Sequence, residues 1–503
     1  MKIHFETLGC RLNHDESEGA ARAFSLQGFV PDMEGVTSST TEDSETVLCV
    51  INTCTVTGKA EQKARRLIRL MLQKYPFAPI IVTGCYAELD ASSIKSICPD
   101  RIAVLAGTKK YLLAAIAVEM NGGVLSIKNG SFSLERLEQY IQAAVSGSGE
   151  KSMRRVSPVT GLNVLSNDAD ETSVPQLDIF SLYTPVFEKH SRGSIKVQDG
   201  CNCACAFCRI HLARGKSVSL SPEEVVSRVK EMEDGGMNEV VFTGVNLSQY
   251  SAAGKDGKRL SFSDLLQLVI DSTSKILLRI SSFYPQSVDD RLCAVLSNPR
   301  VQPFFHLSIQ SGSDRILRLM NRPHSVEHVV RAIEKIRSVK DNPFISCDII
   351  AGFPGESEED FEKTMDLCRN QHFAWIHAFP FSPRPGTPAE KMRPQIPERI
   401  KGERVRLLTE TARQGKIDYI KSWSGKTISA VVENSRAMRK SDGRTSSIHA
   451  VTANYLHIQC PCDEKKYRPG MSVKVTVGEP LEDNIRAGGE IDCTGSISKP
   501  NLC

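Results

Sequence analysis

The amino-acid sequence predicts an α/β protein with three folded parts: an N-terminal open parallel-sheet domain, a central partial (β/α)6 barrel and a small C-terminal antiparallel β-barrel. Strand and helix patterns alternate from residue 1 to about 120, and such alternation implies a parallel sheet covered by helices. The alternation returns more regularly from about 193 to 390, as expected for right-handed β–α units that close toward a barrel. After residue 422, about 60 residues of short strands with polar turns indicate the small barrel.

The first predicted domain covers residues 1–122 and carries four short apolar strands. The expected strands are 2–9, 46–54, 79–85 and 101–107, and the expected helices are 17–29, 59–75 and 109–120. Residues 123–190 are rich in Ser, Gly, Asn and Asp, which predicts a polar linker or insertion with one helix over 133–145.

The central domain is expected over residues 191–422 and ends with a basic helix over 396–422. Helices such as 221–234 and 326–339 separate its strands. The six expected strands are 193–199, 239–245, 276–282, 304–310, 344–350 and 375–381. Six units rather than eight leave the barrel partly open, so a large substrate can reach the C-terminal strand ends where ligands bind.

The small barrel is expected over residues 423–483, and residues 484–503 are predicted to be a poorly ordered tail. The barrel's predicted strands are 428–434, 446–460 and 472–479. Basic residues gather near its start and can contact a phosphate backbone, although from these residues alone a solvated surface is the favoured explanation. They are Lys426, Arg436, Arg439, Lys440 and Arg444.

Composition is that of an ordinary globular protein, with 40% hydrophobic and 24% charged residues. Sixteen cysteines spread over 503 residues do not indicate a disulfide scaffold. The start MKIHFETLGC does not resemble a signal peptide, and no apolar run is long enough to span a bilayer. We therefore expect a cytoplasmic protein without membrane contact; its net charge of +4 permits a nucleic-acid partner without requiring one.

The segment CNCACAFC places Cys201, Cys205 and Cys208 in a C-x3-C-x2-C pattern. Three thiolates this close can hold three irons of a [4Fe–4S] cube and leave the fourth iron open to a substrate or cofactor. Electron-transfer clusters normally use four cysteines, so the pattern indicates chemistry at the cluster. The alternative is a zinc site with Cys203 as fourth ligand.

Three further cysteines, Cys10, Cys54 and Cys85, each follow a predicted parallel strand of the first domain. Because the carboxyl ends of parallel strands share one edge, where ligands bind, these cysteines can meet at one point. Cys49 lies inside an apolar strand and is interpreted as a buried small hydrophobe, and Cys98 does not share the strand-end position. The alternative is that all of them are isolated core cysteines.

Seven motifs resemble the methylthiotransferases, a family of radical S-adenosylmethionine (SAM) enzymes. The resemblance covers most of residues 1–480, in order. The motifs are GCRLNHDESE, INTCTVTGKAEQKARR, IVTGCYAE, QDGCNCACAFCRIHLARG, HLSIQSGSDRILRLM, DIIAGFPGE and FSPRPGTP.

The resemblance implies two [4Fe–4S] clusters and S-adenosyl-L-methionine as cofactors. One cluster is expected on Cys10, Cys54 and Cys85, and the other on Cys201, Cys205 and Cys208. In the family, one SAM methylates sulfur held at the first cluster, and another is cleaved at the second to give a radical that abstracts hydrogen. The cofactors perform that chemistry, and the protein supplies geometry and excludes water. A flavodoxin- or ferredoxin-type electron donor and a sulfur donor are implied partners.

Other residues at predicted strand ends are weaker candidates for binding SAM or the substrate, since tight turns or salt bridges would explain them too. Arg214 in HLARG belongs to this group. So do Thr243, Gly244, Asn246, Ser308, Gln310, Asp348 and Gly352.

The substrate branch is predicted from local sequence. Arg-Leu-Asn after Cys10, VQDGCN and FTGVNLSQY are similar to the enzymes that act on N6-threonylcarbamoyladenosine beside the anticodon of tRNA. The small barrel is similar to the family's RNA-binding (TRAM-like) module. SSFYPQ departs from the family's Ser-Ser-Ile-Glu-Pro, and the linker is longer than usual. The alternatives are isopentenyladenosine in tRNA, a ribosomal-protein aspartate, or a non-catalytic iron–sulfur or zinc protein that binds RNA.

Overall fold

The computed structural model describes residues 1–122, 124–125, 132–146, 178–185, 192–440, 443–462 and 466–498, with side chains left out over 434–446. The chain forms two compact units. Unit 1 comprises residues 1–184, 196–203 and 208–220, and unit 2 comprises 185–195, 204–207 and 221–503. Within the described residues, no helix combines the length and the apolar character that a bilayer crossing requires.

Unit 1 contains a five-stranded parallel sheet with the order β2-β1-β3-β4-β5. The strands are β1 (Lys2–Thr7), β2 (Val30–Asp32), β3 (Thr46–Thr53), β4 (Ile80–Gly84) and β5 (Ile102–Val104). The helices are α1 (Arg11–Leu26), α2 (Gly58–Lys74), α3 (Cys85–Leu89), α4 (Ala91–Lys95), the 3-10 helix η1 (Gly107–Lys109), α5 (Leu112–Met120) and α6 (Leu134–Val145).

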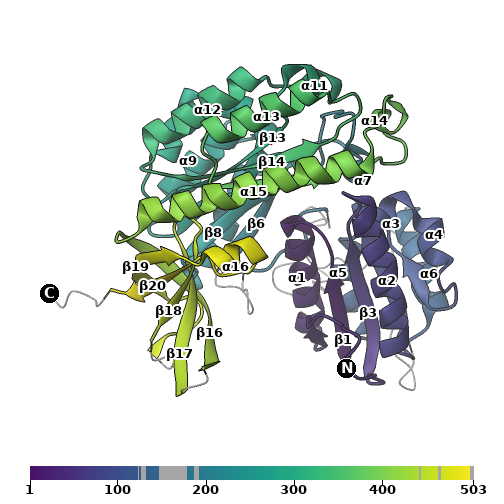
Figure 1. Cartoon of the computed structure of the whole chain (residues 1–503). Helices are drawn as coiled ribbons and strands as arrows, with labels where there is room; N and C mark the ends of the chain where they lie inside the picture. The colour runs from purple at the N-terminus through teal and green to yellow at the C-terminus, as the bar shows by residue number, and fades with distance from the viewer. Residues whose placement is uncertain are drawn as a thin grey trace. The chain divides into compact units, whose positions relative to one another are not determined.

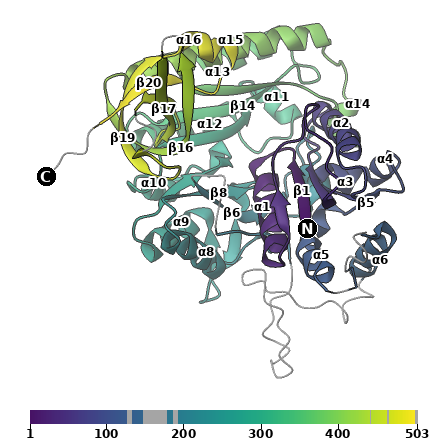
Figure 2. The same cartoon turned by 90° about the horizontal axis from the view of Figure 1, so that it is seen from below.

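Alternate residues of these strands pack on opposite faces of the sheet, because successive side chains of a strand point to opposite sides. Ile3 and Val50 join the core built with α1, α5 and α6, whereas Ile51 and Val82 join the core built with α2, α3 and α4. Helix α1 packs beside α5 (Figures 1 and 2). Cys49 belongs to the second core, which agrees with its interpretation as a small buried hydrophobe.

The predicted barrel strands form two four-stranded sheets, ordered β11-β8-β6-β7 and β12-β13-β14-β15. The predicted third strand is divided at Ser281, so that β11 pairs with β8 and β12 pairs with β13. Their bounds are β6 (Gly193–Asp199), β7 (Val218–Ser219), β8 (Glu239–Gly244), β11 (Leu277–Ile280), β12 (Ser282–Phe283), β13 (Phe304–Gln310), β14 (Phe344–Ala351) and β15 (Trp375–Pro380). A short antiparallel pair, β9 (Ser251–Ala253) and β10 (Arg259–Ser261), was not predicted.

Helices connect these strands, and several begin at a side-chain cap that accepts the exposed N–H groups of the first turn. Ser221, Ser325 and Ser357 cap α8, α12 and α13 in this way. Helices α8 and α9 lie side by side (Figure 2). The helices are α7 (Ile210–Arg214), α8 (Pro222–Asp234), η2 (Leu247–Gln249), α9 (Phe262–Ser272), η3 (Pro285–Ser287), α10 (Asp290–Leu296), α11 (Asp314–Leu319), α12 (Val326–Val339), α13 (Glu358–Asn370), α14 (Pro388–Lys391) and α15 (Glu398–Trp423).

The C-terminal part of unit 2 is a closed five-stranded barrel with the order β16-β17-β18-β20-β19. All its strand pairs are antiparallel except β18–β20. Helix α15 runs along β14 and β15 and shares a hydrophobic core with the barrel (Figure 1). The elements are β16 (Thr427–Lys440), β17 (Gly443–Thr452), β18 (His457–Pro461), β19 (Ser472–Pro480), α16 (Glu482–Ala487) and β20 (Cys493–Ile497).

The α/β fold class is confirmed: a parallel-sheet domain, a partial barrel and a small closed barrel follow one another along the chain. The predicted end of the small barrel, at residue 483, was wrong. Strand β20 lies in the segment expected to be a tail, and it pairs with both β18 and β19 to close the barrel. Its sequence, CTGSI, is short and gives a weak strand signal, because glycine occupies the middle inward position and Cys493 is its one fully buried residue. Most of the predicted linker, 147–177, lies outside the described residues.

Candidate functional site

The three strand-end cysteines of unit 1 lie at one edge of the sheet, as predicted. Cys10 immediately precedes α1, Cys54 follows β3, and Cys85 is the first residue of α3. The parent strands are neighbours, with Thr7 paired to Asn52 and Thr53 paired to Gly84. Register and strand order therefore bring together three cysteines that are far apart in the sequence.

Glycine makes this approach possible. Gly9 has a φ of +117°, and a Cβ at this position would lie 2.7 Å from Cys54 Cβ and 2.9 Å from Asn13 Nδ2. Gly84 has a φ of +99°, and its Cβ would lie 2.3 Å from the Thr53 carbonyl oxygen. Both glycines stand directly before a cysteine and permit left-handed backbone that other residues rarely adopt.

The three thiols also influence one another electrically. Burial raises the pKa of Cys54 to about 11, and the neighbouring Cys10 and Cys85 raise that pKa as well. Three thiolates in this arrangement repel one another and need a cationic group between them. The residues thus fit a metal cluster held by thiolates, and no disulfide joins any pair of them.

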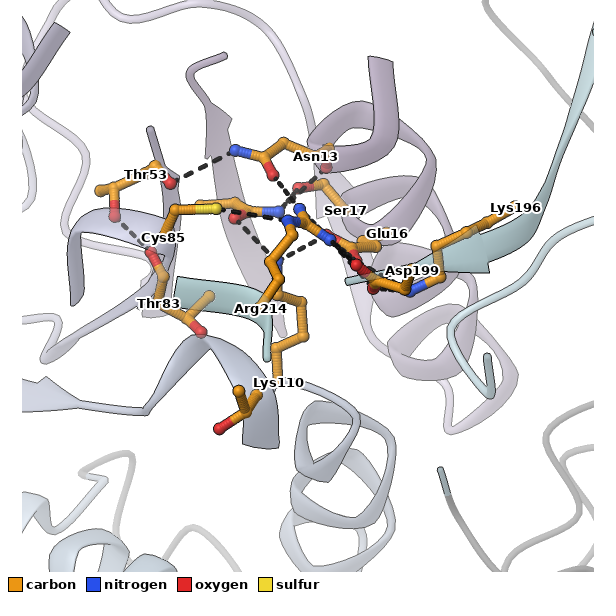
Figure 3. Close-up of polar contacts among 12 residues, drawn as sticks. Asn13, Glu16, Ser17, Thr53, Thr83, Cys85, Lys110, Lys196, Asp199 and Arg214 are labelled. Atoms are coloured by element: carbon orange, nitrogen blue, oxygen red, sulfur yellow. Dashed lines mark hydrogen bonds and ion pairs between the residues drawn. The ribbon is translucent and has the colours of Figure 1, made fainter. Parts of the chain in front are cut away.

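Next to these cysteines is a buried cluster of five charged residues, the charge cluster, shown in Figure 3. Lys110 Nζ lies 2.5 Å from Glu16 Oε2, and Lys196 Nζ lies 2.9 Å from Glu16 Oε1 and 3.1 Å from Asp199 Oδ2. Arg214 Nη1 lies 3.1 Å from Glu16 Oε1 and 2.9 Å from Asp199 Oδ1. Every one of these side chains is at most 7% exposed, so their charges are little screened by water.

The cluster contains three cations and two carboxylates. Burial alone would raise the pKa of Glu16, but Arg214, Lys110 and Lys196 outweigh it and hold this pKa well below its usual range. Burial alone would lower the pKa of Arg214, but Asp199 and Glu16 raise it well above its usual range. With three basic and two acidic side chains, the cluster carries one positive charge more than its carboxylates neutralise.

Arg214 connects this cluster to the cysteines. Its Nε donates to Cys85 Sγ at 3.3 Å, and its Nη2 donates to Asn13 Oδ1 at 2.8 Å (Figure 3). From sequence, an ordinary salt bridge and a contact to the cofactor were both open for this residue. The structure shows ion pairs with Glu16 and Asp199 together with a contact to a predicted cluster ligand. The surplus positive charge beside three thiols matches a cluster that thiolates make anionic.

The CNCACAFC segment follows β6. The amide of Cys203 donates to Cys201 Sγ at 3.4 Å, and the amide of Ile210 donates to Cys208 Sγ at 3.3 Å. Such N–H groups stabilise the thiolates that hold a cluster and tune the reduction potential of that cluster. Two of the three predicted ligand sulfurs thus accept backbone N–H groups, and the alternative of Cys203 as a zinc ligand stays open.

Cys205 of unit 2 is buried and accepts a hydrogen bond from Arg322 Nη1 at 3.4 Å. The same guanidinium donates to Tyr284 Oη at 2.8 Å and to the Ser308 carbonyl at 2.6 Å, and it lies 4.1 Å from the centroid of the Tyr284 ring. Tyr284 belongs to SSFYPQ, the motif that lacks the family's acidic residue. The structure thus shows what this motif does here: Tyr284 orients the arginine that contacts Cys205. Sequence reasoning missed Arg322, which lies two residues after the end of the quoted motif HLSIQSGSDRILRLM.

The residues predicted at the end of β8 are mostly buried. Thr243 donates to the Ile195 carbonyl at 3.1 Å, which gives its hydroxyl a structural partner. Gly244 is half-buried, and Asn246 is buried at the start of η2. Their binding role stays a prediction.

The other predicted residues belong to β13 and β14: Gln310 is the last residue of β13, Asp348 lies within β14, and Gly352 directly follows β14. Gln310 has a φ of +80°, a strained conformation that clusters at ligand sites. Asp348 Oδ2 lies 3.0 Å from His306 Nε2, a partner that the sequence analysis did not name. Burial alone would raise the pKa of Asp348, but the hydrogen bond and charge of His306 outweigh burial and hold this pKa below its usual value. Gly352 is required for packing, since a Cβ there would lie 2.4 Å from Lys401 Cγ.

The predicted RNA-contacting residues lie on the small barrel. Lys426 is exposed, with its Nζ 5.4 Å from the Trp423 ring centroid. Backbone pairing places the other four on the β16–β17 hairpin, where Arg439 is opposite Arg444. Their side chains lie outside the described residues. The four are Arg436, Arg439, Lys440 and Arg444.

Comparison with known proteins gives two family matches. A model described as "Radical SAM superfamily" matches residues 195–368, and one described as "Uncharacterized protein family UPF0004" matches residues 2–106. The first match includes the CNCACAFC segment, and the second includes the three strand-end cysteines of unit 1.

Curated relatives cover nearly the whole chain. "Threonylcarbamoyladenosine tRNA methylthiotransferase MtaB" of Treponema pallidum is 43% identical over 482 residues, covering 91% of this chain and 94% of that protein. The proteins of the same name from Thermotoga maritima and Bacillus subtilis are 32% and 30% identical. The Thermotoga protein covers 86% of both chains, and the Bacillus protein covers 91% of this chain and 89% of its own.

Proposed function

We propose that this chain, which belongs to the family of threonylcarbamoyladenosine tRNA methylthiotransferases, transfers a methylthio group to C2 of the adenine of N6-threonylcarbamoyladenosine next to the anticodon of tRNA. It is a radical SAM transferase that uses [4Fe–4S] clusters and S-adenosyl-L-methionine. The observation that carries the proposal is the pair of cysteine triplets, one at the sheet edge of unit 1 and one after β6.

Cys10, Cys54 and Cys85 would hold one cluster, and Cys201, Cys205 and Cys208 would hold the other. When bound, these clusters and SAM supply radical abstraction of an unactivated hydrogen and delivery of a methylthio group. C2–H of adenine is not acidic enough for base catalysis, so the reaction needs such a route.

The chain's own residues orient and shield these groups. Arg214 and Arg322 each donate to one ligand sulfur, at Cys85 and Cys205 respectively. Backbone amides of residues 203 and 210 donate to two more. We propose that Gln310, the last residue of β13, and Asp348, within the C-terminal half of β14, contact SAM.

The small barrel, with Lys426 and the basic β16–β17 hairpin, is proposed to bind the tRNA backbone. Single-stranded RNA is commonly read by splaying out its bases, which suits an anticodon loop. A one-electron donor of the flavodoxin or ferredoxin type and a sulfur donor complete the partners. We place the enzyme in the cytoplasm, where tRNA and reduced thiols are available.

The test is mass spectrometry of tRNA nucleosides from cells with and without this gene. Deletion should remove 2-methylthio-N6-threonylcarbamoyladenosine, and the unthiolated precursor should accumulate. Loss of the isopentenyladenosine derivative instead would move the enzyme to that branch. Loss of the modification on the ribosomal aspartate would move it to the protein-modifying branch.

A second measurement separates the enzyme from a non-catalytic RNA-binding protein. The purified chain should contain about eight irons for two cubes and no zinc. A Cys10, Cys54 and Cys85 triple alanine variant should keep about half of the iron and still make deoxyadenosine from SAM. It should transfer no methylthio group; continued transfer would mean that this triplet is not the sulfur site.

A further inference from the structure

Arg214 has contacts that reach beyond its role in an ion pair. Each of its three guanidinium nitrogens is used: Nε on Cys85 Sγ at 3.3 Å, Nη1 on Asp199 at 2.9 and 3.0 Å, and Nη2 on Asn13 at 2.8 Å. Both Nη atoms also lie within 3.3 Å of Glu16. Among the described members of the charge cluster, Arg214 alone makes a hydrogen bond to sulfur (Figure 3).

Charge counting gives Arg214 a specific place in this cluster. Lys110 and Lys196 suffice to neutralise Glu16 and Asp199, with contacts of 2.5 to 3.1 Å. The charge of Arg214 is then the surplus, and the remaining groups that it faces are Cys85 and Cys10. A buried cation without a counterion is costly, so its neighbour at the sulfur edge has to be anionic.

The same segment also fixes the backbone of the other triplet. Gly215, next to Arg214, accepts a hydrogen bond from the amide of Cys201 at 3.0 Å. Asp199, the main carboxylate partner of Arg214, stands two residues before Cys201. Residues 214 and 215 therefore contact one predicted ligand of each cluster.

We propose that Arg214 is a positioning residue that holds the Cys85 thiolate and supplies the positive charge that raises the reduction potential of the cluster on Cys10, Cys54 and Cys85. The proposal rests on the proposed function for the presence of that cluster. Reduction adds a negative charge to the cluster, and a nearby guanidinium stabilises the reduced form. Net charge and hydrogen bonds to the sulfurs are general determinants of such potentials.

The test uses a chain with Cys201, Cys205 and Cys208 replaced by alanine, so that one cluster remains to be titrated. Its midpoint potential is measured by electron paramagnetic resonance at poised potentials, after iron and sulfide analysis has shown equal loading. Arg214→Gln removes the surplus positive charge. The rest of the charge cluster (Lys110, Lys196, Glu16 and Asp199) is then neutral overall. Lys110→Gln is the matched control, since it removes one charge from the same group but contacts Glu16 rather than sulfur.

Arg214→Gln should lower the ratio of reduced to oxidised cluster at a fixed potential at least tenfold, which is about 59 mV for one electron. Lys110→Gln should change this ratio much less. Arg214→Lys should keep the ratio of the unaltered chain, because the positive charge is kept. Equal shifts in the Arg214→Gln and Lys110→Gln variants would overturn the proposal. If the Arg214→Gln variant assembles no cluster, Arg214→Lys decides: assembly at the unaltered potential supports the proposal, and failure to assemble overturns it.

The positioning role has its own readout in the chain with all six cysteines. Arg214→Gln should lower the yield of methylthiolated nucleoside per deoxyadenosine formed, whereas Lys110→Gln should leave this ratio close to that of the unaltered chain. An unchanged ratio in Arg214→Gln would limit the residue to structure. If the unaltered chain makes no methylthio product, the proposed function fails while the comparison of potentials still stands.

Discussion

Replacing Glu16 with glutamine tests whether the charge cluster stabilises the N-terminal half of unit 1. Glu16 is 2% exposed and accepts from Lys110, Lys196 and Arg214 at once. The variant leaves three buried cations beside Asp199 alone. Removing one partner of a buried ion pair costs about 3 to 5 kcal/mol, because the remaining charge loses its compensation.

The expected effect is a loss of local stability in helix α1, which carries Glu16 on its buried face. Hydrogen–deuterium exchange of α1 peptides, followed by mass spectrometry, reports the free energy of local opening. A loss of about 3 kcal/mol corresponds to exchange about 100-fold faster or more, since 1.4 kcal/mol is a factor of ten. Arg11→Gln on the same helix is the control: Arg11 is 38% exposed and pairs with Asp15 at 3.8 Å, and such a pair contributes about 0.3 to 0.5 kcal/mol.

A double variant sharpens the test. Glu16→Gln combined with Lys110→Gln returns the cluster to one surplus positive charge, as in the unaltered chain. The double variant should therefore lose less stability than the two single variants lose together. The difference, which is the coupling free energy, should be about 0.5 to 3 kcal/mol. Normal α1 exchange in the Glu16→Gln variant, or strict additivity in the double variant, would refute the reasoning.

Four more outcomes are expected. The protection of α1 against hydrogen exchange should be constant above about pH 4.3, the ordinary pKa of glutamate. It should fall as the pH drops toward the depressed pKa of Glu16, because protonation removes the carboxylate charge. Loss of this protection on raising the pH would contradict the prediction. Gly9→Ala should cost iron at the unit 1 triplet in iron analysis, since the added Cβ meets Cys54 Cβ at 2.7 Å and left-handed backbone costs alanine about 1 to 2 kcal/mol; full iron loading would show that the site adapts. Cys203→Ala should keep cluster iron and SAM cleavage, whereas Cys201→Ala, Cys205→Ala and Cys208→Ala should each abolish cleavage. If the Cys203 variant loses as much iron as the other three, Cys203 is a metal ligand, as in the zinc alternative. Replacing Arg436, Arg439, Lys440 and Arg444 with glutamine should weaken tRNA binding. The slope of log binding constant against log salt concentration should become less steep by about 0.7 to 0.9 for each phosphate that the hairpin no longer neutralises. An unchanged slope would mean that the hairpin is not part of the RNA-binding surface.

The hairpin variant is preferable to deletion of the small barrel, for a reason visible only in the structure. Ile417 and Ile420 of α15 and Phe344 of β14 share a core with barrel residues such as Val432 and Ile458. Deleting the barrel would expose this apolar surface and disturb the helix as well as RNA binding.

Sequence reasoning succeeded where apolar periodicity and strand ends decide the structure. The six barrel strands appear close to their predicted bounds, with the third divided at Ser281. The three unit 1 cysteines meet because parallel strand order brings their ends together. These features depend on local pattern and on a general rule of sheet topology, so a single sequence contains them.

The charge cluster could not be predicted in the same way. Helix α1 was expected to begin at residue 17, because RLNHDE reads as polar, whereas the helix begins at Arg11 and buries Asn13 and Glu16. Lys110, Lys196 and Asp199 come from other segments, and only the folded chain determines which charges meet. The signal available in the sequence was the presence of Lys196 and Asp199 within a predicted barrel strand, where charged side chains need partners.

Unit 1 is discontinuous: residues 196–203 and 208–220 fold with residues 1–184. Glu16 receives two of its three cations, Lys196 and Arg214, from these later segments. A fragment that ends at the first domain's sequence boundary would therefore keep its three cysteines but bury a carboxylate with Lys110 as its one cationic partner among the residues described here. Exchange of N-terminal halves between related enzymes, whether by recombination or by protein engineering, should succeed only when residues 196–220 travel with the half that they complete.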